Sequence, residues 1–83
     1  MSMLIKVLYF GRLKELSGSA EESVELRDGA RIEDLFVQCS TSRPELRKFR
    51  PSLVAARNRE FAAWDTLLHA GDEVGFLPPV SGG

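Results

Sequence analysis

The segment from Ile32 to Cys39 restricts the fold of this chain most, because it has the periodicity of a long helix. Its apolar residues Ile32, Leu35, Phe36 and Cys39 recur at positions i, i+3, i+4 and i+7, which places them on one side of a helix. Pro44 follows soon afterwards and favours an end to the helix before it. With one main helix in 83 residues, most of the core must come from strands.

Strands are predicted on both sides of this helix. Leu4–Phe10 is apolar at nearly every position, and so is the end of Glu73–Leu77, which favours central strands covered on both faces. Glu22–Arg27 alternates between apolar and charged residues and is typical of a half-buried strand. Shorter strands are predicted at Leu53–Arg57 and Phe61–Ala62, joined by a turn at 58–60.

The remaining segments are predicted as connections. Residues 12–16 are expected to form one helical turn stopped by Gly18, and Leu67–Leu68 a one-turn helix stopped by Gly71. Residues 43–52 read as a basic connection flanked by prolines.

The predicted order is strand, strand, helix, strand, short edge strand, strand. This order fits an α+β fold of the β-grasp (ubiquitin-like) type, in which a mixed sheet of four or five strands packs on one main helix. The first and last strands are then parallel neighbours at the centre of the sheet, joined by a right-handed crossover. We therefore expect a domain over residues 1–77 and an extended tail over residues 78–83.

Composition excludes several classes of function. The net charge of −1 gives no indication of a nucleic-acid or membrane partner, and no apolar run approaches the length of a membrane span. A single cysteine rules out an internal disulfide and fits a reducing compartment, so a cytoplasmic location is expected.

The chain ends in Gly82-Gly83, preceded by Pro78 and Pro79. Two glycines without side chains form a thread thin enough for a narrow active-site channel, and their carboxylate is unhindered for acyl activation. The prolines favour an extended conformation. An end of this kind is also common in frayed tails. The apolar run that precedes it favours the functional interpretation.

The segment Ala70–Gly83, with the sequence AGDEVGFLPPVSGG, resembles the C-terminus of the small subunit of molybdopterin synthase, which follows the pattern G-D-E-V-A-F-x-P-P-V-[ST]-G-G. The similarity extends to Ile5–Gly18 and to Val54–Asn58, and so spans nearly the whole chain. Gly75 stands where alanine is more usual, and Arg57 where valine is frequent.

The resemblance implies a sulfur carrier that is not an enzyme on its own. An E1-like adenylyltransferase would use ATP to adenylate the Gly83 carboxylate, with Gly82 beside it, and a sulfur donor acting through this system would convert it to a thiocarboxylate. The large subunit would then receive the tail, within a heterotetramer of two small and two large subunits, and the sulfur would pass to a cyclic pyranopterin monophosphate. No permanently bound cofactor is implied.

Docking of such a tail requires an interface near the last strand. Phe76 and Leu77 point to opposite faces of that strand, so one is expected in the core and the other at the surface. We predict that both contribute to partner binding. The other residues predicted to bind the partner are Phe61, Pro78, Pro79, Val80 and Ser81. Trp64 fits the core and this patch equally well.

Three other interpretations remain open. The chain resembles carriers of sulfur for thiamine thiazole or cysteine in its Gly-Gly end, although the double proline argues against the thiazole carriers. A ubiquitin-like protein modifier would join Gly83 to lysines, and a pure binding module would have an incidental tail.

Other candidate residues favour structural roles. Cys39 lies on the apolar side of the helix and is expected to be a buried thiol. His69 is expected in a turn, and no cluster with metal-ligand spacing accompanies it. The basic residues between 43 and 59 are interpreted as a solvated surface, with docking of an acidic partner as the alternative.

Overall fold

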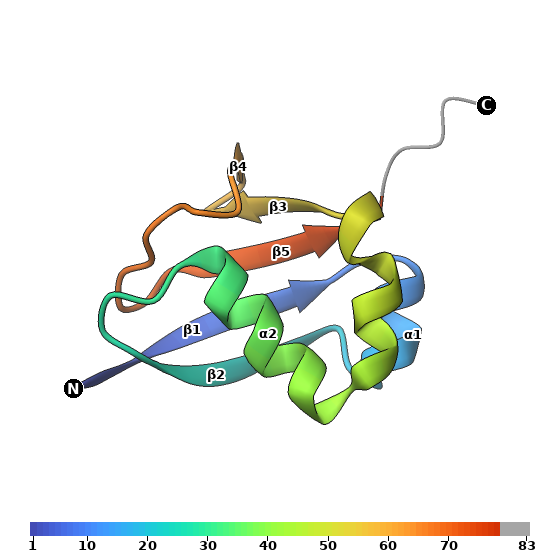
Figure 1. Cartoon of the computed structure of the whole chain (residues 1–83), viewed down its shortest axis with the longest axis horizontal. Helices are drawn as coiled ribbons and strands as arrows, with labels where there is room; N and C mark the ends of the chain where they lie inside the picture. The colour runs from blue at the N-terminus through green and yellow to red at the C-terminus, as the bar shows by residue number, and fades with distance from the viewer. Residues whose placement is uncertain (79–83) are drawn as a thin grey trace.

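The computed structural model describes residues 1–78, and its five strands form one mixed sheet crossed on one face by the main helix (Figure 1). In chain order the elements are β1 (Ser2–Tyr9), α1 (Arg12–Ser17), β2 (Glu21–Arg27), α2 (Ile32–Ser42), the 3₁₀ segment η1 (Pro44–Ser52), β3 (Val54–Arg57), β4 (Glu60–Ala62) and β5 (Glu73–Leu77). None of the helices within residues 1–78 combines the length and the apolar character needed to cross a membrane.

The strand order is β2-β1-β5-β3-β4, with β1 and β5 parallel at the centre. Lys6 pairs with Glu73 and Tyr9 with Phe76 along this parallel register. β2 pairs antiparallel with β1, and β3 pairs antiparallel with both β5 and β4. The structure confirms the predicted β-grasp arrangement.

The core lies between α2 and one face of the sheet. In β1, buried Met3, Ile5, Val7 and Tyr9 alternate with residues on the other face, where Leu4 remains 60% exposed. The prediction that β1 is covered on both faces was therefore wrong for the described residues. Apolar residues at alternate positions indicate that a face avoids water, but they do not say whether the same chain covers it.

An aromatic cluster fixes α2 on the sheet. The ring of Phe36 on α2 meets those of Phe76 on β5 and Trp64 edge-on, at centroid distances of 5.3 and 5.5 Å. The Trp64 ring stacks on Phe76 at 5.7 Å, and the Arg50 guanidinium lies 3.5 Å from the centroid of the Trp64 ring. Trp64 is thus half-buried against the core, where cation–π contact with Arg50 holds its outer face.

Two connections differ from the prediction. Residues 44–52 form 3₁₀ turns that bury Leu46, a structure too irregular in period to be recognised from apolar spacing. Leu67 and Leu68 form no helix. Instead Leu67 forms an isolated antiparallel β-bridge with Arg31, and the Leu68 N–H donates to the Ala30 carbonyl. The segment is extended because it runs beside the start of α2.

The start of β5 is held by a polar network around Asp72. The Asp72 carboxylate accepts hydrogen bonds from the His69 N–H at 2.8 Å and the Asn58 side-chain amide at 3.1 Å. The Asn58 N–H donates to the Glu73 carbonyl, and the Glu73 N–H donates to the Asn58 side-chain oxygen. The Asn58 and Gly-Asp-Glu segments that carried the resemblance therefore hold the β3–β4 turn to β5.

Replacing Asp72 by alanine is expected to lower the free energy of unfolding by about 1–2 kcal/mol near neutral pH, since the part-buried hydrogen bonds from the His69 N–H and the Asn58 amide lose their acceptor. Burial alone would raise the pKa of Asp72, but the His69 N–H, the Asn58 amide and the Arg57 guanidinium together bring the pKa below its usual 3.8. The carboxylate therefore stabilises the fold above about pH 3.8, and this contribution disappears as the pH falls through the lower pKa of the folded state. Urea titrations between about pH 6 and 2 should show the difference between the two proteins shrink. A difference that grows on acidification would contradict this assignment.

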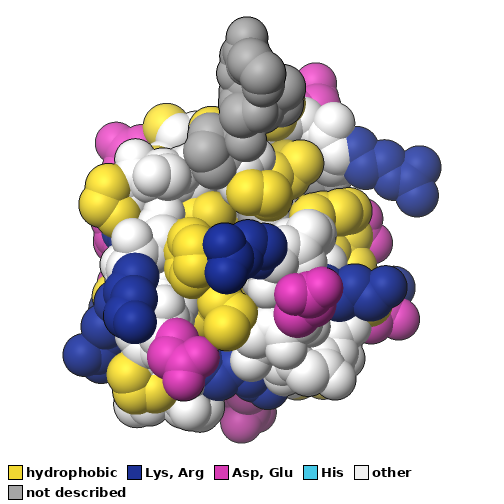
Figure 2. Space-filling model, turned by 90° about the vertical axis from the view of Figure 1, so that its right-hand side faces the viewer, with side chains coloured by type: hydrophobic (Ala, Val, Ile, Leu, Met, Phe, Trp, Pro, Cys, Tyr) yellow, Lys and Arg dark blue, Asp and Glu magenta, His cyan; other side chains and the backbone are white. Residues whose placement is uncertain are grey.

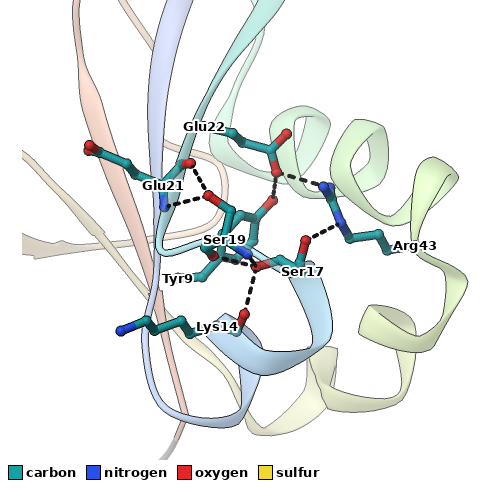
Figure 3. A network of polar contacts seen from close by, with 7 residues as sticks. All are labelled: Tyr9, Lys14, Ser17, Ser19, Glu21, Glu22 and Arg43. Carbon is teal, nitrogen blue, oxygen red and sulfur yellow. Dashed lines mark hydrogen bonds and ion pairs between the residues drawn. The ribbon is translucent and has the colours of Figure 1, made fainter.

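A second network ties the turn after β1 to the end of α2 (Figure 3). The Tyr9 hydroxyl and the Arg43 guanidinium both donate to the same Glu22 carboxylate oxygen, at 2.6 and 2.9 Å. Arg43 also donates to the Ser17 carbonyl at 3.1 Å. These contacts fix α1 beside the end of the sheet at which β1 and β5 finish.

Candidate functional site

The predicted reactive end, Gly82 and Gly83, lies outside the described residues, as do Pro79, Val80 and Ser81. Their roles, and the extended form of the tail, stay predictions. The last described residue is Pro78, which follows β5 and is half-buried. A β-carbon at Gly11 would lie only 3.2 Å from the Pro78 Cγ, so the chain leaves the sheet in close contact with the turn after β1.

The face of the sheet opposite α2 carries a row of mostly apolar residues across all five strands. The pairings Phe61–Ala56, Ala56–Gly75, Gly75–Leu8 and Leu8–Glu21 place these five residues side by side. Because Ala56 and Gly75 are small and the residues on either side of them, Phe61 and Leu8, are large, the sheet is hollowed at Ala56 and Gly75.

This hollow encloses about 210 Å³. Gly75 and Ala56 lie at its floor in the row described above. Its other lining residues are Leu8, Phe10, Phe61 and Leu77, which are apolar, and Arg59 and Glu73, which are charged. We call this set of eight residues the open-face hollow. Figure 2 views the molecule along the strands, from the end at which β1 and β5 finish, and shows hydrophobic side chains gathered between charged ones at that end of the sheet.

The structure separates the predicted interface residues. Phe61 is 80% exposed on the edge strand β4, and half-buried Leu77 lines the hollow from β5. Phe76 is only 1% exposed, so its predicted contact with a partner was wrong. Its side chain points to the α2 face, where Phe36 and Trp64 cover it.

Sequence reasoning missed several residues of the hollow, among them Leu8, Phe10, Ala56 and Gly75. A signal was present in β1, where Leu4 and Leu8 share one side of the strand and Phe10 follows at the next alternate position. Gly75 matters for another reason. A β-carbon there would lie 3.0 Å from the Phe10 Cε2, so the missing side chain allows the Phe10 ring to approach β5.

The residues interpreted as structural keep that role. Cys39 is 4% exposed, and burial raises the pKa of its thiol, which keeps it protonated and poorly nucleophilic. His69 lies exposed in the connection before β5. Among residues 1–78, no three His, Cys, Asp or Glu side chains are grouped in a way that would hold a metal ion.

The basic residues between 43 and 59 do not form one patch. Arg43 pairs with Glu22, Arg50 with Glu33, and Arg57 donates to the Leu67 carbonyl at 3.1 Å. Most of these guanidinium groups therefore hold elements of the fold together. Arg59 differs, since it lines the open-face hollow.

Comparison with known proteins agrees with this geometry. Residues 7–83 match the model of the ThiS family. The chain is 42% identical over 83 residues to a molybdopterin synthase sulfur carrier subunit of Chlamydomonas reinhardtii, covering 98% of this chain and 100% of the relative.

Solved structures show the same fold. A putative molybdopterin converting factor, subunit 1, from Pyrococcus furiosus has a TM-score of 0.85 and 32% identity, covering 94% of this chain and 99% of that chain. A chain of the complex of subunits 1 and 2 of the molybdopterin-converting factor from Helicobacter pylori has a TM-score of 0.65 and 26% identity, and the match covers 98% of this chain and 100% of that chain. The family resemblance inferred from the tail, the first strand and the Asn58 segment is confirmed, and the chain belongs to the ThiS family, among relatives that are sulfur carrier subunits of molybdopterin synthase.

Proposed function

We propose that this chain carries sulfur as a thiocarboxylate on Gly83 and delivers it to the large subunit of a molybdopterin synthase, for transfer to cyclic pyranopterin monophosphate. The observation that carries the proposal is that the open-face hollow runs along β5 from Glu73 to its last residue, Leu77, after which the chain continues to Gly82-Gly83. A surface at that place can bind a partner while the terminus reacts within it.

Chemistry at Gly83 requires activation by another protein. A carboxylate becomes a good acyl donor only when one oxygen is turned into a leaving group, which adenylation with ATP by an E1-like enzyme provides. Sulfur from a donor then displaces AMP and leaves a thiocarboxylate. The described residues offer no activated nucleophile of their own, since Cys39 is buried and protonated. Its free thiol agrees with a cytoplasmic location, which we also propose.

The open-face hollow is proposed as the docking surface of the large subunit. Its lining is mostly apolar with two charged residues, Arg59 and Glu73, and protein interfaces commonly combine an apolar centre with polar residues around it. Phe61, Leu77 and Pro78 are the predicted interface residues that the structure leaves accessible at or near it, and Phe10 joins them. Binding energy from this surface would place the thiocarboxylate at the reacting centre.

The proposal is tested by intact-protein mass spectrometry after incubation with the activating enzyme, ATP and a sulfur donor. A mass increase equal to the replacement of one oxygen by sulfur, followed by its loss when the large subunit and the pterin precursor are added, is the expected result. Covalent conjugates on a denaturing gel, without any thiocarboxylate, would instead indicate a protein modifier.

Gly75→Ala is expected to weaken binding to the large subunit by about three- to tenfold, because an interface depends on close packing at its centre. The new methyl group would push the Phe10 ring, which is 42% exposed and free to move, and would fill part of the hollow. Stability should be unchanged or slightly higher, since alanine loses less chain entropy than glycine on folding.

Isothermal titration calorimetry with the large subunit, together with a thermal melt, measures both effects of Gly75→Ala. Gly29→Ala is unsuitable as a control because Gly29 has a φ of 87°. Ala63→Ser, at an exposed position outside the lining of the hollow, is a suitable one and should leave both values unchanged. An unaltered dissociation constant for Gly75→Ala would show that the floor of the hollow is not contacted.

A further inference from the structure

The turn between β3 and β4 holds an arginine in a backbone conformation that suits glycine. Arg57 pairs with Glu60, so Asn58 and Arg59 form a two-residue hairpin loop. Their φ values are 50° and 72°, and they are the only non-glycine residues with positive φ among residues 1–78. Turns of this kind favour Asn followed by Gly. Asn58 fits the first position, whereas Arg59 is strained at the second.

Contacts of Asn58 fix the first residue of this turn. The turn therefore cannot relax to a conformation that would suit Arg59 better. The Asn58 N–H and side chain bond to the Glu73 backbone and to Asp72 at distances of 2.7 to 3.1 Å. The loop therefore keeps its shape whatever residue follows Asn58. Local conformation favours glycine at position 59, so the presence of arginine indicates a role for its side chain.

That side chain has no structural partner in the described part of the chain. By contrast, the guanidinium groups of Arg43, Arg50 and Arg57 are each bonded to a carboxylate or a carbonyl. Arg59 is exposed and has no ion pair or hydrogen bond from its guanidinium to any residue within 1–78. It lines the open-face hollow, with Phe61 two positions further on.

We propose that Arg59 is a specificity-determining residue that binds a carboxylate of the large subunit, next to an apolar side chain of the large subunit that enters the open-face hollow. This inference rests on the proposed function and identifies the chemistry of the partner surface. Arginine suits such a contact because its planar guanidinium can donate two parallel hydrogen bonds to one carboxylate. A hollow of about 210 Å³ has room for one large side chain, since a cavity of roughly 150 Å³ accommodates benzene.

Substitution of Arg59 by glycine should change stability and partner affinity in opposite directions. Arg59→Gly removes the strain of a side chain at positive φ, and should raise the melting temperature of the free chain by about 2–5 °C. The same change removes the charge that meets the partner, and should weaken binding to the large subunit about tenfold. A residue with a merely structural role would lose stability and affinity together, or neither.

The experiment is a titration of the large subunit into the full chain at low and physiological salt, with a thermal melt of each variant. Arg59→Lys retains the charge and the strained turn but loses the planar fork of donors, so its affinity should lie between those of Arg59→Gly and the unsubstituted chain. Arg47→Ala is the matched control for loss of one positive charge, because Arg47 is exposed on η1 and does not line the hollow. Arg47→Ala should change neither the affinity for the large subunit nor the melting temperature.

The possible outcomes separate this inference from the proposed function. Weaker binding of Arg59→Gly with a higher melting temperature, and no effect of Arg47→Ala, supports the role of Arg59. Equal binding of Arg59→Gly and the unsubstituted chain overturns that role while the proposed function stands. If the unsubstituted chain does not bind the large subunit at all, the proposed function is overturned and this inference falls with it.

Discussion

A chain that lacks Gly83 is expected to lose sulfur transfer completely and to keep its fold. Deletion withdraws the terminal carboxyl group by about 3.3 Å, and a misplacement of about 1 Å already costs roughly 100-fold in rate. Glycine has no side chain to contribute to the core, so the melting temperature should stay within about 2 °C. Product formation in the reconstituted synthase, with the thiocarboxylate followed by mass spectrometry, measures the loss.

One alanine appended after Gly83 provides the second arm of this experiment. The appended residue moves the carboxyl group forward by the same distance and is expected to abolish transfer as well. Binding to the large subunit should survive in both variants, because the open-face hollow is untouched. Either variant supporting transfer at the rate of the unaltered chain would refute the role of Gly83.

Phe76→Ala is expected to lower the free energy of unfolding by about 3–5 kcal/mol. A chain of this size has only about 4–12 kcal/mol in total, so the variant should be partly unfolded at 37 °C. The reason is that Phe76 is almost fully buried and its ring contacts both Phe36 and Trp64. Urea unfolding followed by circular dichroism measures the change.

Phe61→Ala is the matched comparison, because it removes the same side chain from the opposite face of the sheet. Phe61 is 80% exposed, so stability should change by no more than about 0.5 kcal/mol. Binding to the large subunit should weaken by about 30-fold or more if Phe61 is an aromatic anchor of the interface. The reverse pattern, with Phe76→Ala stable and Phe61→Ala unfolded, would contradict the assignment of the two faces.

The fold was predictable because its strongest determinants are local in sequence. Few arrangements of one helix and five strands fit the sequence. They must agree with the apolar positions of α2, the alternation in β2 and the largely apolar strands β1 and β5. The 3₁₀ turns of η1 and the extended course of Leu67 were missed, since each depends on contacts with distant residues. The spacing of apolar residues along the sequence does not indicate such contacts.

The site was predictable only in part, and for a related reason. A strand that is apolar on both faces, such as β1, has the same sequence whether its second face is covered by its own chain or by a partner. Gly75 and Ala56 are inconspicuous until the register places them side by side between Phe61 and Leu8. Arg59 reads as an ordinary turn residue until its φ of 72° is known.

The central position of β5 has a mechanical consequence for a chain whose end is proposed to react inside a partner. β5 is hydrogen-bonded to β1 on one side and to β3 on the other. A pull on the terminus runs along the strand, so the bonds on both sides share the load in shear rather than opening one after another, as they would in a hairpin pulled apart from its tip. Force applied during insertion into a partner and withdrawal from it would therefore have to break the hydrogen bonds on both sides of β5 together before the domain opened.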